Sequence, residues 1–577
     1  MTTIYNEIKT KASNLVNQFI TKPRIRISLD MSGFASGADE ILDAFKDSVK
    51  KYKKDVYLTV NGGFGMANEE PLIDIQLPGT GRVFYSKVTV EDVDNIFVEH
   101  VINNKPIIDR AFAVLDYPEL NTVLPELHEL PMMKKQLRIA LRNAGHIDPE
   151  NIYEYINIGG YGALDKALST MNSDEVIDEV VKSGLRGRGG AAFQTGVKWK
   201  FLKGSKEPKK FIIGNCEEGD PGAFNDKSIL ESDPHTLIEG MILAGFATRA
   251  SDGIVFIRHG HNIPIDRTRL AIKQAYELGF LGENILGSDF SFDVEVVLVG
   301  ESYVSGEETA LMDSIEGKRA MPRFRPPFPA TYGVWGKPSN INNIKTLSYV
   351  PAIVGNGSDW FSNIGTEKST GTAMICLSGN ISQPGLVEVP MGLTIREVID
   401  DCGGGVPGGK EVKLLQTGGP LGGVLSAAQL DIPIDFDAMA KAGAILGSGG
   451  IIVGDTDVCA VDLARLLVAF CQYESCGKCF PCRLGTTHLL EILQRICNFK
   501  AEDKDLELMT KIGSDMQVGS LCGHGQLGFN PIKSALDYFG DEFNMVMKNK
   551  KWPTTTYKEE FFMPDSSLRN STDRIIK

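Results

Sequence analysis

Three cysteines in one short segment are the residues of this sequence best suited to chemistry. Cys476, Cys479 and Cys482 lie at positions i, i+3 and i+6, and Cys522 can supply a fourth thiol. Zinc ribbons use two separated Cys-x2-Cys pairs, whereas three thiolates in one turn with a distant fourth fit the corners of an iron–sulfur cubane. The spacing therefore predicts a [4Fe–4S] cluster, with zinc or four unrelated buried thiols as alternatives. The other cysteines stand alone and are predicted to pack as small hydrophobic side chains: Cys216, Cys376, Cys402, Cys459, Cys471 and Cys497.

A glycine-rich stretch over residues 184–199 is the second candidate. It contains three cations, Arg186, Arg188 and Lys198, and precedes a predicted strand at 211–214. Bare backbone N–H groups and cations together form a cradle for an anionic group. An ordinary surface turn is the alternative, because a glycine loop alone is a weak indication.

Carboxylates follow the predicted strands. Residues 215–224 hold Glu217, Glu218 and Asp220 among glycines, and residues 306–309 hold two more glutamates. Such side chains at strand ends lie where α/β sheets bind ligands. Two further segments complete this polar set: the proline-stiffened residues 322–329 and the pair Asn342-Asn343.

The elements that must position these residues alternate along the chain. Strands predicted at 211–214, 253–257 and 294–299 alternate with helices at 235–250 and 263–278, which indicates a wound, mostly parallel sheet.

The flanking regions have other patterns. Residues 370–445 predict a small α+β insert, residues 457–547 have a helical period throughout, and residues 117–132 are predicted to be a linker. The first 110 residues form a cysteine-free α/β unit. Its predicted elements are helices at 5–22, 39–52 and 91–103 and strands at 24–29, 56–60 and 72–77.

Composition limits the class of protein. A chain of 577 residues holds about three to five domains. Its 60 basic and 74 acidic residues give a net charge of −14, which disfavours nucleic acid and anionic membrane surfaces as partners. No apolar run reaches the roughly 18 residues of a membrane helix, so we expect no membrane insertion. Cysteines in a large chain without a secretory signal favour a reducing compartment, and we expect a cytoplasmic protein.

Together the motifs resemble the flavin-binding, NADH-oxidising subunit of respiratory complex I and its relatives in NAD-linked hydrogenases and formate dehydrogenases. The likeness covers about residues 150–545. It rests on the glycine loop and, in family order, on Glu-Gly-Asp-Pro-Gly, Gly-Glu-Glu-Thr-Ala-Leu, Pro-Pro-Phe-Pro-Ala, Ile-Asn-Asn and Glu-Ser-Cys-Gly-Lys-Cys-x-Pro-Cys-Arg. It implies FMN and one [4Fe–4S] cluster as cofactors and NAD(H) as substrate. Three positions depart from the family pattern: Gln194, the pair Cys216-Glu217, and Arg325, where a lysine is usual.

The resemblance implies an α/β multidomain fold. The expected domains are a thioredoxin-like domain (1–125), a Rossmann-like FMN- and NADH-binding domain (130–360), a β-grasp insert of the soluble-ligand-binding type (361–445), a helical [4Fe–4S] domain (446–548) and a tail (549–577).

The resemblance also implies roles for single residues. Glu218 and Asp220 are the expected catalytic residues, and Cys476, Cys479, Cys482 and Cys522 the expected cluster ligands. Expected cofactor contacts are Gly187, Arg188, Gly189, Gly190, Lys198, Asn215, Glu217, Glu218, Tyr303, Gly306, Glu307, Glu308, Asn342 and Asn343. Expected NADH contacts are Phe193, Phe201, Asp220, Glu308, Arg325 and Phe328.

The N-terminal unit is similar to a thioredoxin-like [2Fe–2S] domain fused in front of the corresponding chain in hydrogenase relatives. Ser36-Gly-Ala and residues 87–94 carry that likeness, but residues 30–34 and 62–66, where that family places cysteines, contain none. Without thiolates no second cluster can form, and a docking surface is the expected role.

We therefore expect an NADH:acceptor oxidoreductase subunit in which flavin converts hydride transfer into single-electron steps. The resemblance implies iron–sulfur partner subunits, among them a small thioredoxin-like [2Fe–2S] subunit and a larger catalytic subunit. The N-terminal unit and residues 418–423 favour a hydrogenase-like complex, a group that includes electron-bifurcating hydrogenases, or a transhydrogenase. An NAD-linked formate dehydrogenase module, a non-catalytic scaffold and a zinc-stabilised nucleotide-binding module are the alternatives.

Overall fold

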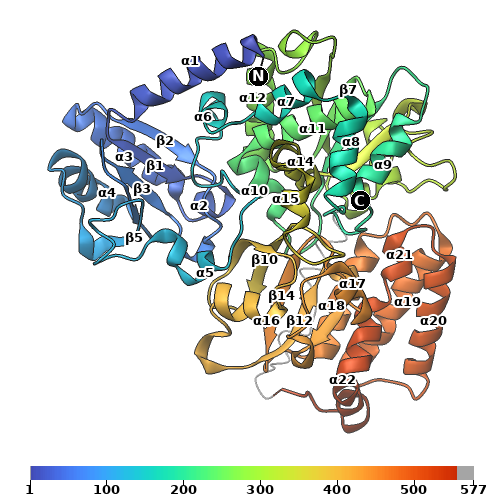
Figure 1. Ribbon diagram of the computed structural model, residues 1–577. Coiled ribbons are helices and arrows are strands. Elements are labelled where there is room, and N and C mark those ends of the chain that lie inside the picture. The colour runs from blue at the N-terminus through green and yellow to red at the C-terminus, as the bar shows by residue number, and fades with distance from the viewer. Residues whose placement is uncertain (1, 555–577) are drawn as a thin grey trace.

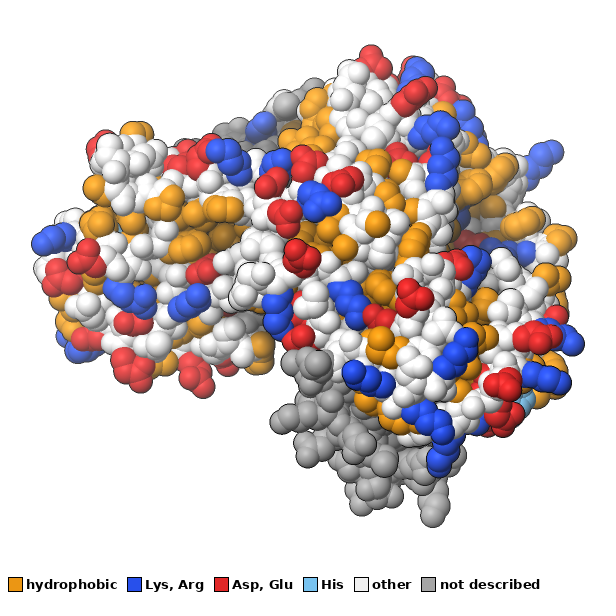
Figure 2. Space-filling model, turned by 90° about the horizontal axis from the view of Figure 1, so that it is seen from below, with side chains coloured by type: hydrophobic (Ala, Val, Ile, Leu, Met, Phe, Trp, Pro, Cys, Tyr) orange, Lys and Arg blue, Asp and Glu red, His pale blue; other side chains and the backbone are white. Residues whose placement is uncertain are grey.

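The computed structural model describes residues 2–554 of the chain (Figure 1). Most of the predicted tail lies outside the described residues. Within them, no helix has both the length and the apolar character needed to cross a membrane. Figure 2 shows acidic and basic side chains interspersed over one face of the molecule.

The N-terminal unit is a mixed five-stranded sheet with strand order β2-β1-β3-β4-β5. Its strands are β1 (Arg24–Ser28), β2 (Tyr57–Asn61), β3 (Ile73–Gln76), β4 (Arg82–Tyr85) and β5 (Ala111–Leu115). Its helices are α1 (Thr3–Phe19), α2 (Met31–Ala35), α3 (Ala38–Tyr52) and α4 (Val90–Ile96), the last continued by a π-helical turn over Phe97–Ile102. The predicted helices and strands are confirmed. Strands β4 and β5 were not predicted. Strand β4 begins with Arg82, whose charge is buried in an ion pair with Asp74 and a hydrogen bond to the Gly145 carbonyl oxygen.

One face of this sheet carries charges that are buried against the rest of the molecule. Arg24 pairs with Glu154 at 2.6 Å, and Asp74 pairs with both Arg26 at 2.7 Å and Arg82 at 2.5 Å. Each of these side chains is less than a tenth exposed. Because a buried charge without a partner is costly, these pairs favour one arrangement of the N-terminal unit on its neighbour.

The cysteine-free loop 62–66 lies inside the molecule. A Cβ atom at Gly62 would lie 2.2 Å from the Ser232 Cα atom, and one at Gly65 would lie 2.3 Å from the Leu386 carbonyl oxygen. Phe64 between them is buried. This loop therefore joins the N-terminal unit to two other parts of the chain, and the predicted docking role does not extend to it.

The central unit is the predicted wound sheet. Its four strands are parallel in the order β8-β7-β6-β9. This confirms the predicted parallel sheet and its three predicted strands, whereas β9 was not predicted. They are β6 (Phe211–Cys216), β7 (Asp252–Arg258), β8 (Asp293–Val299) and β9 (Ser339–Asn343). Packed around them are α6 (Ile152–Asn157), α7 (Gly162–Thr170), α8 (Ser173–Lys182), α9 (Thr195–Lys203), α10 (Asn225–Ser232), α11 (Pro234–Thr248), α12 (Asn262–Glu277), α13 (Glu308–Ile315), α14 (Ile344–Asn356) and α15 (Ser358–Ser362). Helix α11 is apolar around almost its whole circumference and is buried along its length, as a core helix should be.

A second five-stranded sheet follows, in the order β11-β10-β14-β12-β13. Its strands are β10 (Thr372–Gly379), β11 (Gly385–Pro390), β12 (Val412–Thr417), β13 (Val424–Ser426) and β14 (Gly450–Asp455), with α16 (Ile395–Glu397) and α17 (Phe436–Lys441) beside them. Strand β14 comes from the range expected to be helical and pairs with both β10 and β12. The predicted linker over residues 117–132 packs against this sheet. Its Leu127, together with Met132 and Met133 of α5 (Pro131–Lys134), is part of the hydrophobic core of the sheet.

The last unit is the predicted helical bundle, drawn in red in Figure 1. It consists of α18 (Ala460–Tyr473), α19 (Phe480–Cys497), α20 (Asp505–Gly519), α21 (Gly523–Leu527) and α22 (Asn530–Asn549). Side chains such as Leu489, Leu493 and Ile496 of α19 and Phe543 of α22 form its core.

Candidate active site and metal centre

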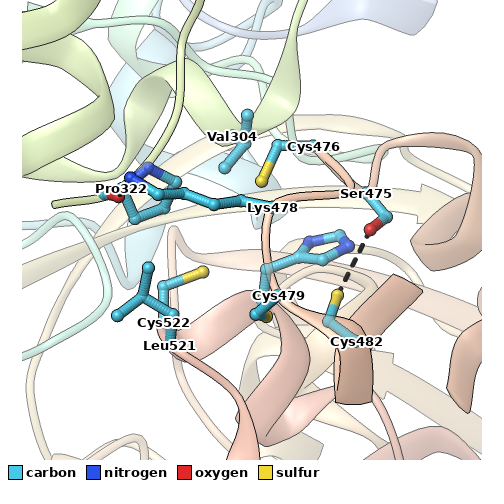
Figure 3. A pocket seen from close by; sticks show the side chains of 10 residues that line it. Val304, Pro322, Ser475, Cys476, Lys478, Cys479, Cys482, Leu521 and Cys522 are labelled. Atoms are coloured by element: carbon cyan, nitrogen blue, oxygen red, sulfur yellow. Dashed lines mark hydrogen bonds between the residues drawn. The ribbon is translucent and has the colours of Figure 1, made fainter. Parts of the chain in front are cut away.

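The four predicted cluster ligands line one hollow at the end of the bundle (Figure 3). Cys476 and Cys479 lie between α18 and α19, Cys482 lies in the first turn of α19, and Cys522 directly precedes α21. The other residues that line the hollow are Val304, Pro322, Ser475, Lys478, Leu521 and His524. Across residues 2–554, no three His, Cys, Asp or Glu side chains converge closely enough for a single metal ion, so the thiols frame the hollow without meeting at one point.

The local sequence explains this geometry. Gly477 has φ +73°, a left-handed conformation that favours glycine, and Pro481 begins α19 without needing a backbone N–H partner. Burial raises the pKa of Cys482 to about 12 and that of Cys522 to about 11. Since the thiolate is the metal ligand, iron must displace these protons, and four cysteines with Lys478 at hand fit an anionic iron–sulfur cluster.

The predicted polar residues meet at the carboxyl ends of β6 and β9. Asn215 and Asn343 are neighbours in the register of these strands. The Asn215 Nδ2 atom donates to the Gly306 carbonyl oxygen at 2.9 Å, and the Asn343 Nδ2 atom donates to Asp226 Oδ2 at 2.6 Å. Three distant segments are thereby joined, as the parallel sheet predicts.

The carboxylates after β6 have unusual protonation properties. Burial raises the pKa of Glu217 to about 8, although Arg258 lies 3.3 Å from it. Burial also raises the pKa of Glu218 to about 7, while its two oxygens accept from the Asp226 and Lys227 N–H groups at the start of α10. Carboxyl groups that titrate near neutral pH are suited to holding a proton next to a redox cofactor.

The glycine loop differs from the expected cation cradle. The Arg188 guanidinium is buried, donates to the Thr370 oxygen at 2.6 Å and the Thr372 oxygen at 3.2 Å, and faces the rings of Tyr349 and Phe436. It therefore holds the loop in place and is not free to bind an anion. The other two cations are also engaged: Arg186 pairs with Asp437, and Lys198 pairs with Glu308.

The loop backbone remains suited to a phosphate-bearing cofactor. A Cβ atom at Gly189 would lie 2.7 Å from the Asn343 Cβ atom, and Gly190 has φ +121°. A Cβ atom at Gly190 would reach to 4.0 Å from Gly447 in the loop before β14. Two glycine segments thus face one another beside Asn343, and side chains here would fill the space. This backbone cradle fits FMN.

The predicted nucleotide contacts are grouped around one carboxylate. Glu308 lies 2.7 Å from Arg325 and 3.0 Å from Lys198. Burial acts to raise the pKa of Glu308, but the charges of Lys198 and Arg325 outweigh it and hold that pKa below its usual value. Three aromatic side chains near these ion pairs in the sequence are each more than half exposed. Phe193 and Phe201 flank Lys198, and Phe328 follows Arg325 by three residues. Glu307 has a structural contact, since it caps α13 through the Thr309 and Ala310 N–H groups.

Tyr303 connects the carboxylates to the hollow. Its hydroxyl donates to Asp220 Oδ1 at 2.8 Å, and its backbone N–H donates to Glu474 Oε2 at 3.0 Å, two residues before Cys476. Its neighbour Val304 lines the hollow itself. The two candidate sites therefore adjoin.

Several residues of the site were not predicted from the sequence. Ser448 donates to Asp220 Oδ2 at 2.7 Å from a loop more than 220 residues away. Its surroundings, Gly447-Ser448-Gly449-Gly450, were the available indication, because glycines of this density mark close backbone approach. Nothing in the sequence indicated that Arg258 and Lys345 belong to the site, because an isolated cation is usually on the surface.

An all-parallel sheet with a glycine cradle at its carboxyl edge, next to four thiols around one hollow, defines a flavin- and iron–sulfur-binding redox protein. Three family models match: the Nuo51 FMN-binding domain over residues 180–352, the SLBB domain over 374–425, and the NADH-ubiquinone oxidoreductase-F iron–sulfur binding region over 462–546.

Individual relatives agree. The chain is 49% identical over 420 residues to the NADP-reducing hydrogenase subunit HndC of Solidesulfovibrio fructosivorans, covering 73% of this chain and 85% of that one. It is 41% identical to the F 2 subunit of the NADH-quinone oxidoreductase of Rhizobium meliloti (strain 1021), covering 72% and 99%. A crystal structure of an NAD+-reducing [NiFe]-hydrogenase shares the fold, with a TM-score of 0.64 at 24% identity over 99% of this chain and 94% of that one. The chain belongs to the family of the F subunits of NADH-quinone oxidoreductase, and it is an oxidoreductase subunit that uses NADH, FMN and a [4Fe–4S] cluster.

Proposed function

We propose that this chain is the NADH-oxidising, or NAD+-reducing, module of a hydrogenase-type complex. The backbone of residues 187–190 would hold FMN and the four cysteines would hold the [4Fe–4S] cluster. When bound, FMN would supply the conversion of a two-electron hydride transfer into single-electron steps, which a cluster that takes one electron at a time requires. The protein's task is to hold nucleotide, flavin and cluster in sequence and to keep water from the reacting atoms.

Each group of residues has its own part in this proposal. The backbone of residues 187–190 and the amides of Asn215 and Asn343 hold the flavin, and the four cysteines hold the cluster. Phe193, Phe201 and Phe328 stack against NADH, while Glu308 accepts from its ribose hydroxyls. Glu218 and Asp220 lie nearest the reacting atoms and hold a proton there.

The observation that carries the proposal is the path through Tyr303. Asp220, the Tyr303 hydroxyl and the adjoining Val304 bring the carboxylate site to the wall of the thiol-lined hollow. Electron transfer between the two cofactors needs such proximity.

Anaerobic addition of NADH to the purified chain tests it. We expect loss of the flavin absorbance and an iron-type EPR signal from the reduced cluster. A non-catalytic scaffold would give neither response, and a zinc-containing module would give no EPR signal. Either result would refute the proposal.

We further propose domain identities and partners. The N-terminal unit is a thioredoxin-like domain without a cluster, the central unit is Rossmann-like, and the second sheet is a β-grasp module. This module extends past its expected border at residue 445, because β14 is one of its strands. The partners are a small thioredoxin-like [2Fe–2S] subunit and a larger catalytic subunit. The 49% identity to a hydrogenase subunit supports this choice over a formate dehydrogenase. The ten cysteines, which all lie within residues 216–522, form no disulfide bond with one another, and this is consistent with a cytoplasmic complex. Co-purification from the native host tests the partners, and detection of a formate dehydrogenase subunit would contradict them.

A further inference from the structure

Lys345 is a fully buried cation beside the candidate flavin site. It lies in the first turn of α14, two residues after Asn343, and is only 2% exposed. Its Nζ atom donates to Asn225 Oδ1 at 2.7 Å and to the Ser448 carbonyl oxygen at 2.9 Å, and it lies 3.2 Å from Asp226 Oδ1. A lysine is almost never buried to this extent without paired charges, so these contacts decide its position.

The contacts of Lys345 join three segments that meet at the site. Asn225 and Asp226 begin α10 after the carboxylate loop, Ser448 lies in the loop before β14, and Lys345 itself follows β9. The Asn343 amide donates to the same Asp226 carboxylate, on its other oxygen, at 2.6 Å. The Lys345 ammonium group therefore holds α10, the loop before β14 and the start of α14 together at the site.

Each joined segment also carries a predicted functional residue. Ser448 donates through its hydroxyl to Asp220, and Glu218 caps the N–H groups of Asp226 and Lys227. Displacing the ammonium group would free Ser448, Asp226 and Asn343 to move, and with them the residues that they orient.

Lys345 also balances charge. Asp226 is buried, and Glu218 and Asp220 are partly buried near it. Burial and the charge of Asp226 raise the pKa of Glu218, whereas Lys227 and Lys345 oppose that rise. Lys227 is partly exposed, and on the other side of the loop Arg258 is paired with Glu217. Of these cations, Lys345 is therefore the fully buried one, and water screens it least.

We propose that Lys345 is a positioning residue of the flavin site, which clamps these three segments together and offsets the negative charge of their carboxylates, so that the site favours reduced, anionic FMN over oxidised FMN. The proposal rests on FMN binding at this site. It predicts that the charge, and not only the volume, of Lys345 affects the cofactor.

The test uses the full-length chain reconstituted with FMN. Lys345→Met removes the charge with little change of volume, Lys345→Gln keeps a hydrogen-bond donor without the charge, and Lys345→Arg keeps the charge. The matched control is Lys210→Met, because Lys210 is also buried in this unit but lies before β6, where its Nζ atom donates only to the Thr248 oxygen at 3.2 Å. Two quantities are measured: the dissociation constant of FMN, by flavin fluorescence, and the midpoint potential of bound FMN, by anaerobic redox titration.

In Lys345→Met and Lys345→Gln we expect the preference for reduced over oxidised FMN to fall about tenfold, which lowers the midpoint potential by about 30 mV for a two-electron couple. Weaker binding of oxidised FMN should accompany this change. Lys345→Arg should retain most of the potential, and Lys210→Met should leave both quantities unchanged.

Four other results would also be decisive. An unchanged potential and unchanged FMN affinity in both neutral variants would overturn the proposal. Equal changes in Lys210→Met would show a general effect of losing a buried lysine and would also overturn it. If both neutral variants fold, as judged by circular dichroism, but bind no FMN while Lys345→Arg does, the clamp is supported. Failure of the wild-type chain to bind FMN would instead refute the proposed function.

Discussion

Replacing Glu308 by glutamine should narrow the preference of this protein for NADH over NADPH, mainly by improving its use of NADPH. A carboxylate that accepts hydrogen bonds from the adenosine ribose repels the 2′-phosphate that NADPH carries there. The wild-type protein should therefore favour NADH. The opposite preference is a real alternative, because a relative at 49% identity is named an NADP-reducing hydrogenase subunit.

The structure sets the size of the effect. Two unit charges 4 Å apart interact by about 1 kcal/mol in water and about 4 kcal/mol at an effective dielectric constant of 20. Glu308 is partly buried, but Arg325 at 2.7 Å and Lys198 at 3.0 Å offset its charge. We therefore expect the lower part of this range, about 1.4 kcal/mol, which is tenfold in the ratio of kcat/KM values.

The assay compares kcat/KM for NADH and NADPH in the wild type and in Glu308→Gln. Glu316→Gln is the matched control, because Glu316 also pairs with cations, Lys318 and Arg323, but is not among the expected nucleotide contacts. A wild type that already favours NADPH, or a ratio that Glu308→Gln leaves unmoved, would show that Glu308 is not the selector. An equal shift in Glu316→Gln would show a non-specific effect of charge.

Four further predictions concern the cofactors and the fold. The chain should hold one FMN and one [4Fe–4S] cluster, because it has a single four-cysteine set; about eight iron atoms per chain by metal analysis would contradict this. Cys479→Ser should retain FMN but stop electron transfer to partner subunits, and a normal rate of transfer would show that the cluster is misassigned. Gly62→Ala should destabilise the N-terminal unit by about 1–3 kcal/mol in thermal unfolding, because its Cβ atom would meet the Ser232 backbone at 2.2 Å. The control Gly540→Ala has open space around it and should not destabilise the protein, so equal effects of the two variants would contradict the close contact at Gly62. Burial raises the pKa of Glu231 to about 8 from an ordinary value of 4.5, so its contribution to stability is complete below about pH 4.5 and is lost as the pH rises to about 8. The free energy of unfolding of Glu231→Gln should therefore exceed that of the wild type above pH 8, by about 1 kcal/mol or more, and equal it near pH 4.5. The same difference at both pH values would show that the Glu231 carboxyl does not titrate in this range.

The sequence alone determined the chemistry of the metal centre and the class of the central sheet. Three thiols within seven residues can be at most roughly 20 Å apart in an extended chain, and a turn or helix start in that segment brings them much closer. Strands of buried aliphatic residues that alternate with helices leave few topologies other than a wound parallel sheet, and the functional loops then meet at its carboxyl edge. For these reasons the grouping of the polar residues that follow the strands could be expected, although strand β9 and the pairing of Asn215 with Asn343 were not predicted.

Tertiary structure decided which polar groups are available at the site. Arg188 has the sequence pattern of a free cation, but carbonyl oxygens more than 180 residues away take up its guanidinium. The local sequence around Ser448 and Lys345 does not show that their side chains contact Asp220 and Asp226. Loop 62–66 lies inside the molecule because Ser232 and Leu386, both distant in the sequence, approach its glycines closely. Spacing along the chain controls contacts within a few residues. Contacts between distant segments depend on how whole units pack, and that information is spread over the sequence as burial and is not held in any single motif.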